Sequence, residues 1–146
     1  MKAVESRDFP VLLGMMRSLA EHSPAIAFDE GEVRAALRTF LAHREFGGSW
    51  LISLREQVAG YVILTLGYSF EYRGRDAFVD ELYIEPEFRR MGLGRRALGF
   101  AEERARKLGV NALHLEVDAG NDAALELYRR AGYASQGRHL MTKWLR

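Results

Sequence analysis

Hydrophobic residues recur at helical spacing in two segments near the start of the chain. Between residues 8 and 22, and again between residues 31 and 43, apolar side chains fall three or four positions apart, which predicts two amphipathic helices separated at Pro24. Residues 49–54 and 57–68 are instead rich in β-branched, aliphatic and aromatic side chains, and the polar pair Arg55-Glu56 joins them at hairpin length. Residues 77–84 form a third such run. We therefore expect two helices followed by a three-stranded antiparallel meander.

The pattern changes to strand, helix, strand, helix after Pro86. Residues 94–108 place an apolar stripe opposite arginines and glutamates, and Gly109 is positioned to end that helix. Residues 112–117 predict a strand, and Asn121 is a good N-cap for a helix that runs to Ala131. Residues 134–145 predict one or two final strands. The expected fold is a single α/β or α+β domain over residues 1–146, with a mostly antiparallel sheet and a β-α-β unit in its second half.

Composition narrows the classes of function. Lys and Arg number 21 against 20 Asp and Glu, so the net charge of +1 argues against a non-specific nucleic-acid binder. No apolar run is long enough for a membrane span, and the N-terminus lacks the apolar core of a signal peptide, so we expect a soluble, cytoplasmic protein that binds no membrane. The chain has no cysteine and its four histidines are scattered, so we expect no metal site.

The segment EFRRMGLGRRAL, from Glu87 to Leu98, combines two glycines with four arginines. It lies between an expected strand and an expected helix, where free backbone N–H groups and the helix dipole favour an anion such as phosphate. One alternative is that the glycines only shape a tight turn and the arginines are solvated. A second alternative is dinucleotide binding, because GLGRRA fits GxGxx(G/A) and Glu116 follows about 20 residues later. That fingerprint belongs in the first βα turn of a parallel sheet, whereas here a long meander precedes it.

Two motifs at a fixed separation resemble the GCN5-related N-acetyltransferase (GNAT) family. Residues 89–94, RRMGLG, match the (R/Q)xxGx(G/A) pyrophosphate loop of that family. Residues 121–133, NDAALELYRRAGY, are similar to its NxxAxxLYxxxGF segment, with Tyr133 in place of the final Phe. The clear match covers about residues 79–133, and the preceding residues agree only in the order of their elements.

The resemblance implies a GNAT fold: a mixed, mostly antiparallel sheet of about six or seven strands, splayed between the fourth and fifth, with about four helices. It also implies acetyl-coenzyme A (acetyl-CoA) as co-substrate and transfer of the acetyl group to a primary amine by direct attack on the thioester. The acceptor would be a small-molecule or protein amine, and relatives often form homodimers. An alternative with the same fold is a non-catalytic acyl-CoA binding or sensing module.

The resemblance further assigns residues to the cofactor. The strand before the loop would offer its backbone to pantetheine, and the loop would hold the pyrophosphate. Asn121 can instead act only as a helix N-cap, and Tyr128 only as a core aromatic. The residues expected to bind the cofactor are Leu82, Tyr83, Ile84, Arg89, Arg90, Met91, Gly92, Leu93, Gly94, Arg95, Asn121, Ala124 and Tyr128.

Candidate catalytic residues follow from the chemistry. An alkyl ammonium titrates near pH ~10, so the attacking amine needs a proton acceptor, and the leaving thiolate benefits from an acid, for which the resemblance points to Tyr128. Asp80 and Glu81 are adjacent on the strand before the loop, so only one faces the cleft unless a bulge intervenes. Relatives favour the first position of such a pair, Asp80. Glu116 is a third candidate, by resemblance to ribosomal-protein acetyltransferases, and each carboxylate can instead be a solvated strand charge.

Overall fold

The structure is a computed structural model that describes residues 1–21 and 27–145. Its centre is a five-stranded sheet in the order β1-β2-β3-β4-β5, in which neighbouring strands are antiparallel except for the parallel pair β4 and β5. The strands are β1 (Lys2–Ala3), β2 (Gly47–Leu54), β3 (Gln57–Ser69), β4 (Gly74–Ile84) and β5 (Val110–Leu115). The helices are α1 (Phe9–Ala20), α2 (Glu30–Ala42), α3 (Leu93–Lys107) and α4 (Asp122–Arg130), with short 3-10 turns η1 (Ser6–Asp8), η2 (Arg44–Phe46) and η3 (Pro86–Phe88).

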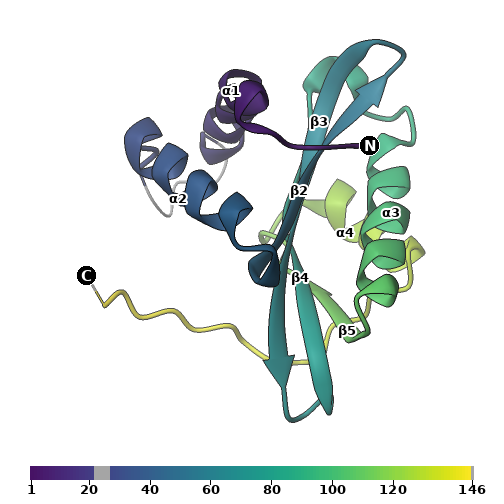
Figure 1. The fold of residues 1–146 in the computed structure, drawn as a ribbon. Helices are drawn as coiled ribbons and strands as arrows, with labels where there is room; N and C mark the ends of the chain where they lie inside the picture. The colour runs from purple at the N-terminus through teal and green to yellow at the C-terminus, as the bar shows by residue number, and fades with distance from the viewer. Residues whose placement is uncertain (22–26, 146) are drawn as a thin grey trace.

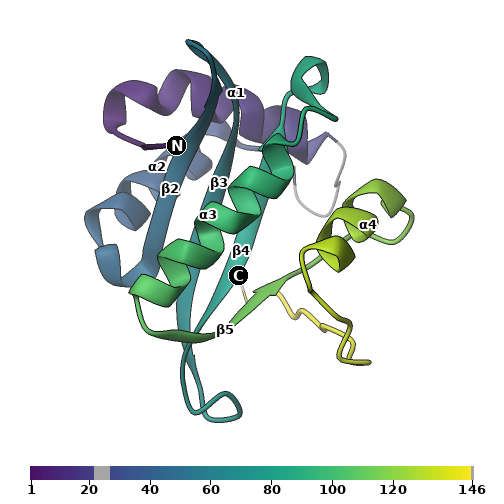
Figure 2. The ribbon, with the colours of Figure 1, turned by 90° about the vertical axis from the view of Figure 1, so that its right-hand side faces the viewer.

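The helices cover both faces of the sheet. Helices α1 and α2 lie on one face and α3 lies on the other, with α4 beside the end of β5 (Figures 1 and 2). On the first face, Leu12 and Leu13 of α1 pack with Tyr61 of β3 in a fully buried cluster. On the second face, Leu98 and Ala101 of α3 pack against alternate residues of the same strands. The sheet thus separates two apolar cores, and this explains the long uninterrupted apolar run of β3.

The predicted helices and meander are confirmed, with boundaries that move by at most three residues. Local signals account for the accuracy at α3 and α4: Gly109 and Gly132 adopt positive φ angles of 71° and 93° just after these helices, and Asn121 caps α4 by accepting a hydrogen bond from the Ala124 N–H at 3.1 Å. Strand β4 begins at Gly74, earlier than predicted, because its first residues pair with the end of β3. The predicted separation at Pro24 lies outside the described residues.

The predicted final strands are wrong. Residues 134–145 form no strand in the described part of the chain, so the sheet has five strands there and not six or seven. A strand needs a hydrogen-bonded neighbour, and this segment runs away from the sheet instead (Figure 1). Arg138 tethers it to the β3–β4 hairpin through two hydrogen bonds to Glu71, at 2.6 and 2.7 Å, while Leu140, Met141 and Leu145 remain exposed.

Strand β4 departs from regular sheet pairing in two ways. The parallel pairing with β5 ends at Val79 and Leu115, whereas β4 continues along β3 as far as Ile84, so the two strands diverge as the family resemblance implies (Figure 2). At the same level, Leu64 pairs with Val79 and Ile63 pairs with Glu81, which leaves Asp80 as the extra residue of a β-bulge. The divergence opens the sheet where the bulge reorients its side chains.

Candidate active site

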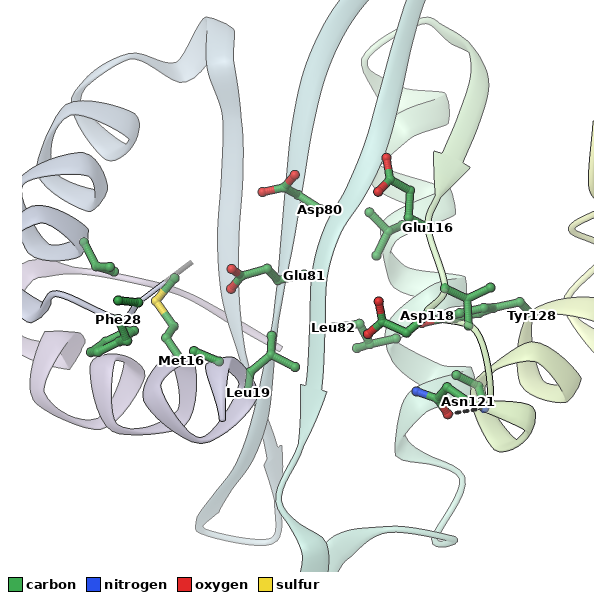
Figure 3. Close-up of a pocket in the computed structure, with 16 residues that line it drawn as sticks. Met16, Leu19, Phe28, Asp80, Glu81, Leu82, Glu116, Asp118, Asn121 and Tyr128 are labelled. Carbon is green, nitrogen blue, oxygen red and sulfur yellow. Dashed lines mark hydrogen bonds between the residues drawn. The ribbon is translucent and has the colours of Figure 1, made fainter. Parts of the chain in front are cut away.

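A cavity of about 450 Å³ lies where β4 and β5 diverge. Helices α1 and α2 supply its apolar wall, β4 and the segment after β5 supply its carboxylates, and the start of α4 closes one side (Figure 3). The lining residues are Met16, Leu19, Ala20, Ala27, Phe28, Val33, Val79, Asp80, Glu81, Leu82, Glu116, Val117, Asp118, Asn121, Ala124 and Tyr128. All four predicted catalytic side chains are in this set, so residues 48 positions apart, from Asp80 to Tyr128, meet at one site.

The bulge places Asp80 and Glu81 on the same face of the sheet. Before the bulge, Ala77 and Val79 pack toward α3, whereas after it Tyr83 packs toward α1. This change of phase means that the adjacent carboxylates both point into the cavity (Figure 3), and the alternation expected of a regular strand does not hold here. The bulge that would allow both Asp80 and Glu81 to face the cleft is therefore present.

Glu81 is held in place by a tyrosine of the neighbouring strand that was not among the predicted site residues. Tyr61 of β3 is fully buried, and its hydroxyl donates a hydrogen bond of 2.7 Å to Glu81 Oε2. Burial raises the pKa of Glu81, the Tyr61 hydrogen bond opposes that rise, and the nearby Asp80 charge adds to it. The same burial, together with the Glu81 charge, raises the pKa of Tyr61 far above its usual range, so the phenol stays protonated as the donor.

Asp80 is less enclosed than Glu81 and forms no hydrogen bond or ion pair with the described residues. Its side chain is exposed at the mouth of the cavity, yet partial desolvation raises the pKa of this carboxyl above its ordinary value. Glu116 and Asp118 lie across the gap, immediately after β5, and both are exposed (Figure 3). Glu116 was expected at a strand position, but β5 ends one residue before it. Asp118 is a further lining carboxylate that the sequence argument missed.

Tyr128 and Asn121 reach the cavity from α4. Tyr128 is partly buried beside Tyr133, with ring centroids 6.2 Å apart, and desolvation raises the pKa of its phenol. The side chain carbonyl of Asn121 caps α4, as one interpretation of the sequence held, and the residue also lines the cavity with Ala124. The two interpretations of Asn121 are compatible, because capping uses Oδ1 and leaves the Nδ2 group to donate to a ligand.

The glycine loop ends at the N-terminus of α3. Arg90 and Gly92 adopt left-handed conformations, with φ angles of 61° and 76°, and the first helical hydrogen bond in this turn runs from the Arg96 N–H to the Gly92 carbonyl. The N–H groups of residues 93–95 therefore have no helical acceptor and can bind an anion. Arg89 is turned back toward β4, where its Nε donates a 2.9 Å hydrogen bond to the Ile84 carbonyl. Its role in the structure is to fix the loop on the end of β4.

Some of the lining residues had no signal in the sequence. Met16, Leu19 and Val33 belong to ordinary apolar stripes of α1 and α2, and Phe28 precedes α2. Only the packing of these segments beside β4 brings the four side chains to the carboxylates. Among residues 1–21 and 27–145, no three His, Asp or Glu side chains are arranged to hold a metal ion. No helix in the same residues is long and apolar enough to cross a membrane.

Comparison with known proteins agrees with this architecture. The model of the acetyltransferase (GNAT) family matches residues 13–133. The chain belongs to the GNAT family. An uncharacterized N-acetyltransferase of Methanocaldococcus jannaschii is 27% identical over 108 residues, which cover 73% of this GNAT chain and 47% of that relative. The thialysine N-epsilon-acetyltransferase of Bos taurus is 32% identical over 75 residues, which cover 51% of this chain and 44% of the relative.

This GNAT chain spans less than half of the length of those two curated relatives. Among solved structures, an integron cassette protein from a salt-marsh metagenome is 32% identical with a TM-score of 0.87, and the match covers 99% of this chain and 90% of that one. The family assignment and the GNAT fold are thereby confirmed, and the dinucleotide-binding alternative for the glycine loop is set aside.

Proposed function

We propose that this protein transfers an acetyl group from acetyl-CoA to a primary amine by direct attack of the amine on the thioester. The observation that carries the proposal is the convergence, in one cavity at the β4–β5 divergence, of Asp80, Glu81, Glu116 and Tyr128. Family membership supports the reaction class, and the Bos taurus relative, whose name specifies an N-epsilon acetyltransferase, supports an amine acceptor. The acceptor is a small-molecule or protein amine.

Residues that line the cavity, together with the end of β4 and the glycine loop outside its lining, fit coenzyme A. From Asp80 to Ile84 no described strand pairs with β4 on the side of β5, so the backbone groups of Leu82, Tyr83 and Ile84 that do not bond β3 would suit an extended amide chain such as pantetheine, and Arg89 already bonds the Ile84 carbonyl. The residues of the loop and the α3 N-terminus, Arg89 to Arg95, would hold the pyrophosphate, and Gly92 adds no Cβ in the left-handed position it occupies. Asn121 and Ala124 would contact the chain from α4. When bound, acetyl-CoA supplies an activated acyl thioester.

Asp80 is the proposed proton acceptor. Desolvation brings the pKa of its carboxyl closer to neutral pH than that of a solvated aspartate, and no described side chain competes for its oxygens. Glu81 is held by Tyr61 and is better suited to bind the acceptor's ammonium form than to exchange protons. Glu116, across the cavity, is the remaining candidate for the base. A carboxylate at the mouth can pass the proton to water.

Tyr128 is the proposed acid for the leaving thiolate. Its raised pKa keeps the phenol protonated at neutral pH, and its position on α4 faces the β4 edge across the cavity. A backbone N–H on the unpaired edge of β4, near Leu82, would stabilise the carbonyl oxygen as it gains charge. In this proposal Asp80 of β4 removes a proton and Tyr128 of α4 donates one, from opposite sides of the reacting carbonyl.

Two measurements on the full chain test the proposal. Calorimetry with coenzyme A measures binding, and release of free thiol from acetyl-CoA in the presence of a broad panel of primary amines measures transfer. We expect saturable binding and amine-dependent thiol release, with Asp80→Asn reducing release while binding is retained. Binding without amine-dependent release would contradict catalysis and favour an acyl-CoA sensing module. Absence of both would sink the proposal altogether.

A further inference from the structure

The charged side chains among the described residues that line the cavity are all acidic. Four of its lining residues, Asp80, Glu81, Glu116 and Asp118, carry carboxylates, and none of the described lining residues is Lys, Arg or His. The carboxylates come from two different elements and face the same space, two from β4 and two from the segment after β5 (Figure 3). Four negative charges around one cavity repel one another, and a single ammonium group neutralises only part of them.

The opposite wall is apolar. Met16, Leu19, Phe28 and Val33 line the cavity from α1, α2 and the residues before α2. Arg17 packs its guanidinium 5.5 Å from the Phe28 ring, but it is outside the cavity lining and is directed to Glu30, a carboxylate that it shares with Arg34. A ligand that fills this space therefore meets carboxylates on one side and hydrocarbon on the other, which suits short methylene chains between charged groups.

The unpaired positive charge lies at the other end of the site. Arg90, Arg95 and Arg96 are exposed around the α3 N-terminus and form no ion pair with the described residues. The site is thus basic where an anionic donor would be held and acidic where the acceptor would enter. This polarity favours an acceptor of opposite charge to the donor, and it disfavours any acceptor that carries a carboxylate.

We propose that the acceptor is a primary amine with a second positive charge on a short hydrocarbon chain and with no carboxylate. This inference rests on the proposed function. The reacting nitrogen lies near Asp80 and Glu81 and, as an ammonium, first loses one proton to Asp80, which passes it to water. The neutral amine then forms the C–N bond as the C–S bond breaks, and the thiolate takes a proton from Tyr128. The second proton lost by the nitrogen returns through water to the Tyr128 phenolate, so one proton is released to solvent for each acetyl group transferred. The second ammonium group pairs with Glu116 and Asp118, and the methylenes pack on the α1–α2 wall.

Three amines with chains of the same length separate the contributions of charge. Putrescine ends in a second ammonium, n-butylamine in a methyl group and γ-aminobutyrate in a carboxylate. With saturating acetyl-CoA, we expect kcat/KM for putrescine to exceed that for n-butylamine by about fivefold to tenfold, the combined effect of pairing with two exposed carboxylates, with γ-aminobutyrate lowest. Raising the salt concentration should narrow the differences because the charges are partly exposed.

A variant separates recognition by the protein from the intrinsic reactivity of each amine. Asp118→Asn should lower the ratio of putrescine to n-butylamine several-fold, since the intrinsic difference between the amines is the same for both enzymes. Glu103→Gln removes the same charge from the outer face of α3, where Glu103 pairs with Lys107, and should leave the ratio unchanged. Equal kcat/KM values for the three amines would overturn the inference while leaving the proposed function intact. A ratio that Asp118→Asn does not lower would overturn it too. No thiol release with any amine would overturn the proposed function itself.

Discussion

Replacing Tyr61 with Phe removes one oxygen atom from the centre of the sheet and tests how Glu81 is held. The phenol is fully buried and donates a 2.7 Å hydrogen bond to Glu81 Oε2, while the ring shape is preserved in the variant. A hydrogen bond to a charged group contributes about 1.5–3 kcal/mol to stability. Because Glu81 lines an open cavity where water can replace part of the lost bond, we expect the free energy of unfolding to fall by about 1–2 kcal/mol at neutral pH.

The direction of the pH effect follows from the same contact. The Tyr61 hydrogen bond lowers the pKa of Glu81 against the effect of burial, so its removal shifts the pKa of Glu81 further upward. The stability deficit of Tyr61→Phe should shrink as pH falls and Glu81 becomes neutral, because a bond between neutral groups contributes only about 0.5–1.5 kcal/mol. Urea denaturation across a pH series measures the deficit, and carboxyl-detected NMR titration follows Glu81 itself.

Tyr83→Phe is the matched control for this experiment. Tyr83 lies on the neighbouring strand in the same core, and its hydroxyl donates a 3.0 Å hydrogen bond to Glu85, outside the cavity. This variant should lose stability without moving the titration of Glu81. The proposed anchoring of Glu81 by Tyr61 is refuted if Tyr61→Phe leaves the Glu81 titration unchanged, or if its stability deficit is the same at every pH.

Four further outcomes are expected. Tyr128→Phe should lower kcat while the dissociation constant for coenzyme A stays level, as single-turnover thiol release and calorimetry would show, and unchanged turnover would remove Tyr128 from the chemistry. Asp80→Asn should lower kcat by about 10²–10⁴-fold, the usual contribution of a general base, and a loss confined to KM would assign the residue to binding instead. Gly92→Ala should destabilise the fold by about 1 kcal/mol because the φ angle of Gly92 is 76°. Gly99→Ala, in the middle of α3 with open space around it, should stabilise the fold by about the same amount. Equal denaturation midpoints for the two variants would contradict the role of the loop conformation. Burial raises the pKa of Glu81 in the folded state, so the ionised carboxylate lowers the stability of the fold above that pKa, and this cost disappears below the ordinary pKa of a glutamate. Glu81→Gln should therefore be more stable than the parent protein at high pH and lose that advantage in acid. A stability difference that is the same at every pH would refute this prediction.

The sequence predicted best where a local signal exists. Gly109 and Gly132 end helices because they adopt conformations that other residues resist, and Asn121 begins one because its side chain bonds a nearby N–H. These interactions span only a few residues, so they can be inferred from spacing alone. The motif around Tyr128 is equally local, and Tyr128 lines the cavity, while its role as the acid stays a prediction from the family resemblance.

Features that depend on partners distant in sequence could not be read in the same way. The orientation of Asp80 and Glu81 depends on a bulge against Ile63 and Leu64, which no periodicity in β4 reveals. The Tyr61 contact joins residues 20 positions apart on neighbouring strands. The apolar residues near the C-terminus have strand-like composition, yet pairing decides whether they form a strand, and that pairing is absent from the described residues.

The bulge at Asp80 also lets β4 present two acidic residues in succession on one face of the sheet. Side chains on the two sides of the bulge alternate in opposite phase. Ala77 and Val79 pack toward α3 before the bulge, and Leu82 and Ile84 pack toward α3 after it. Deleting the extra residue would restore one regular alternation along the whole strand and leave Leu82, Tyr83 and Ile84 on their present faces, but it would remove one of the two adjacent carboxylates from the cavity. A change of length at this position therefore alters the carboxylates that the cavity receives without exchanging the faces of the two apolar cores, so β4 can be adapted to a new acceptor by loss of the extra residue as well as by substitution.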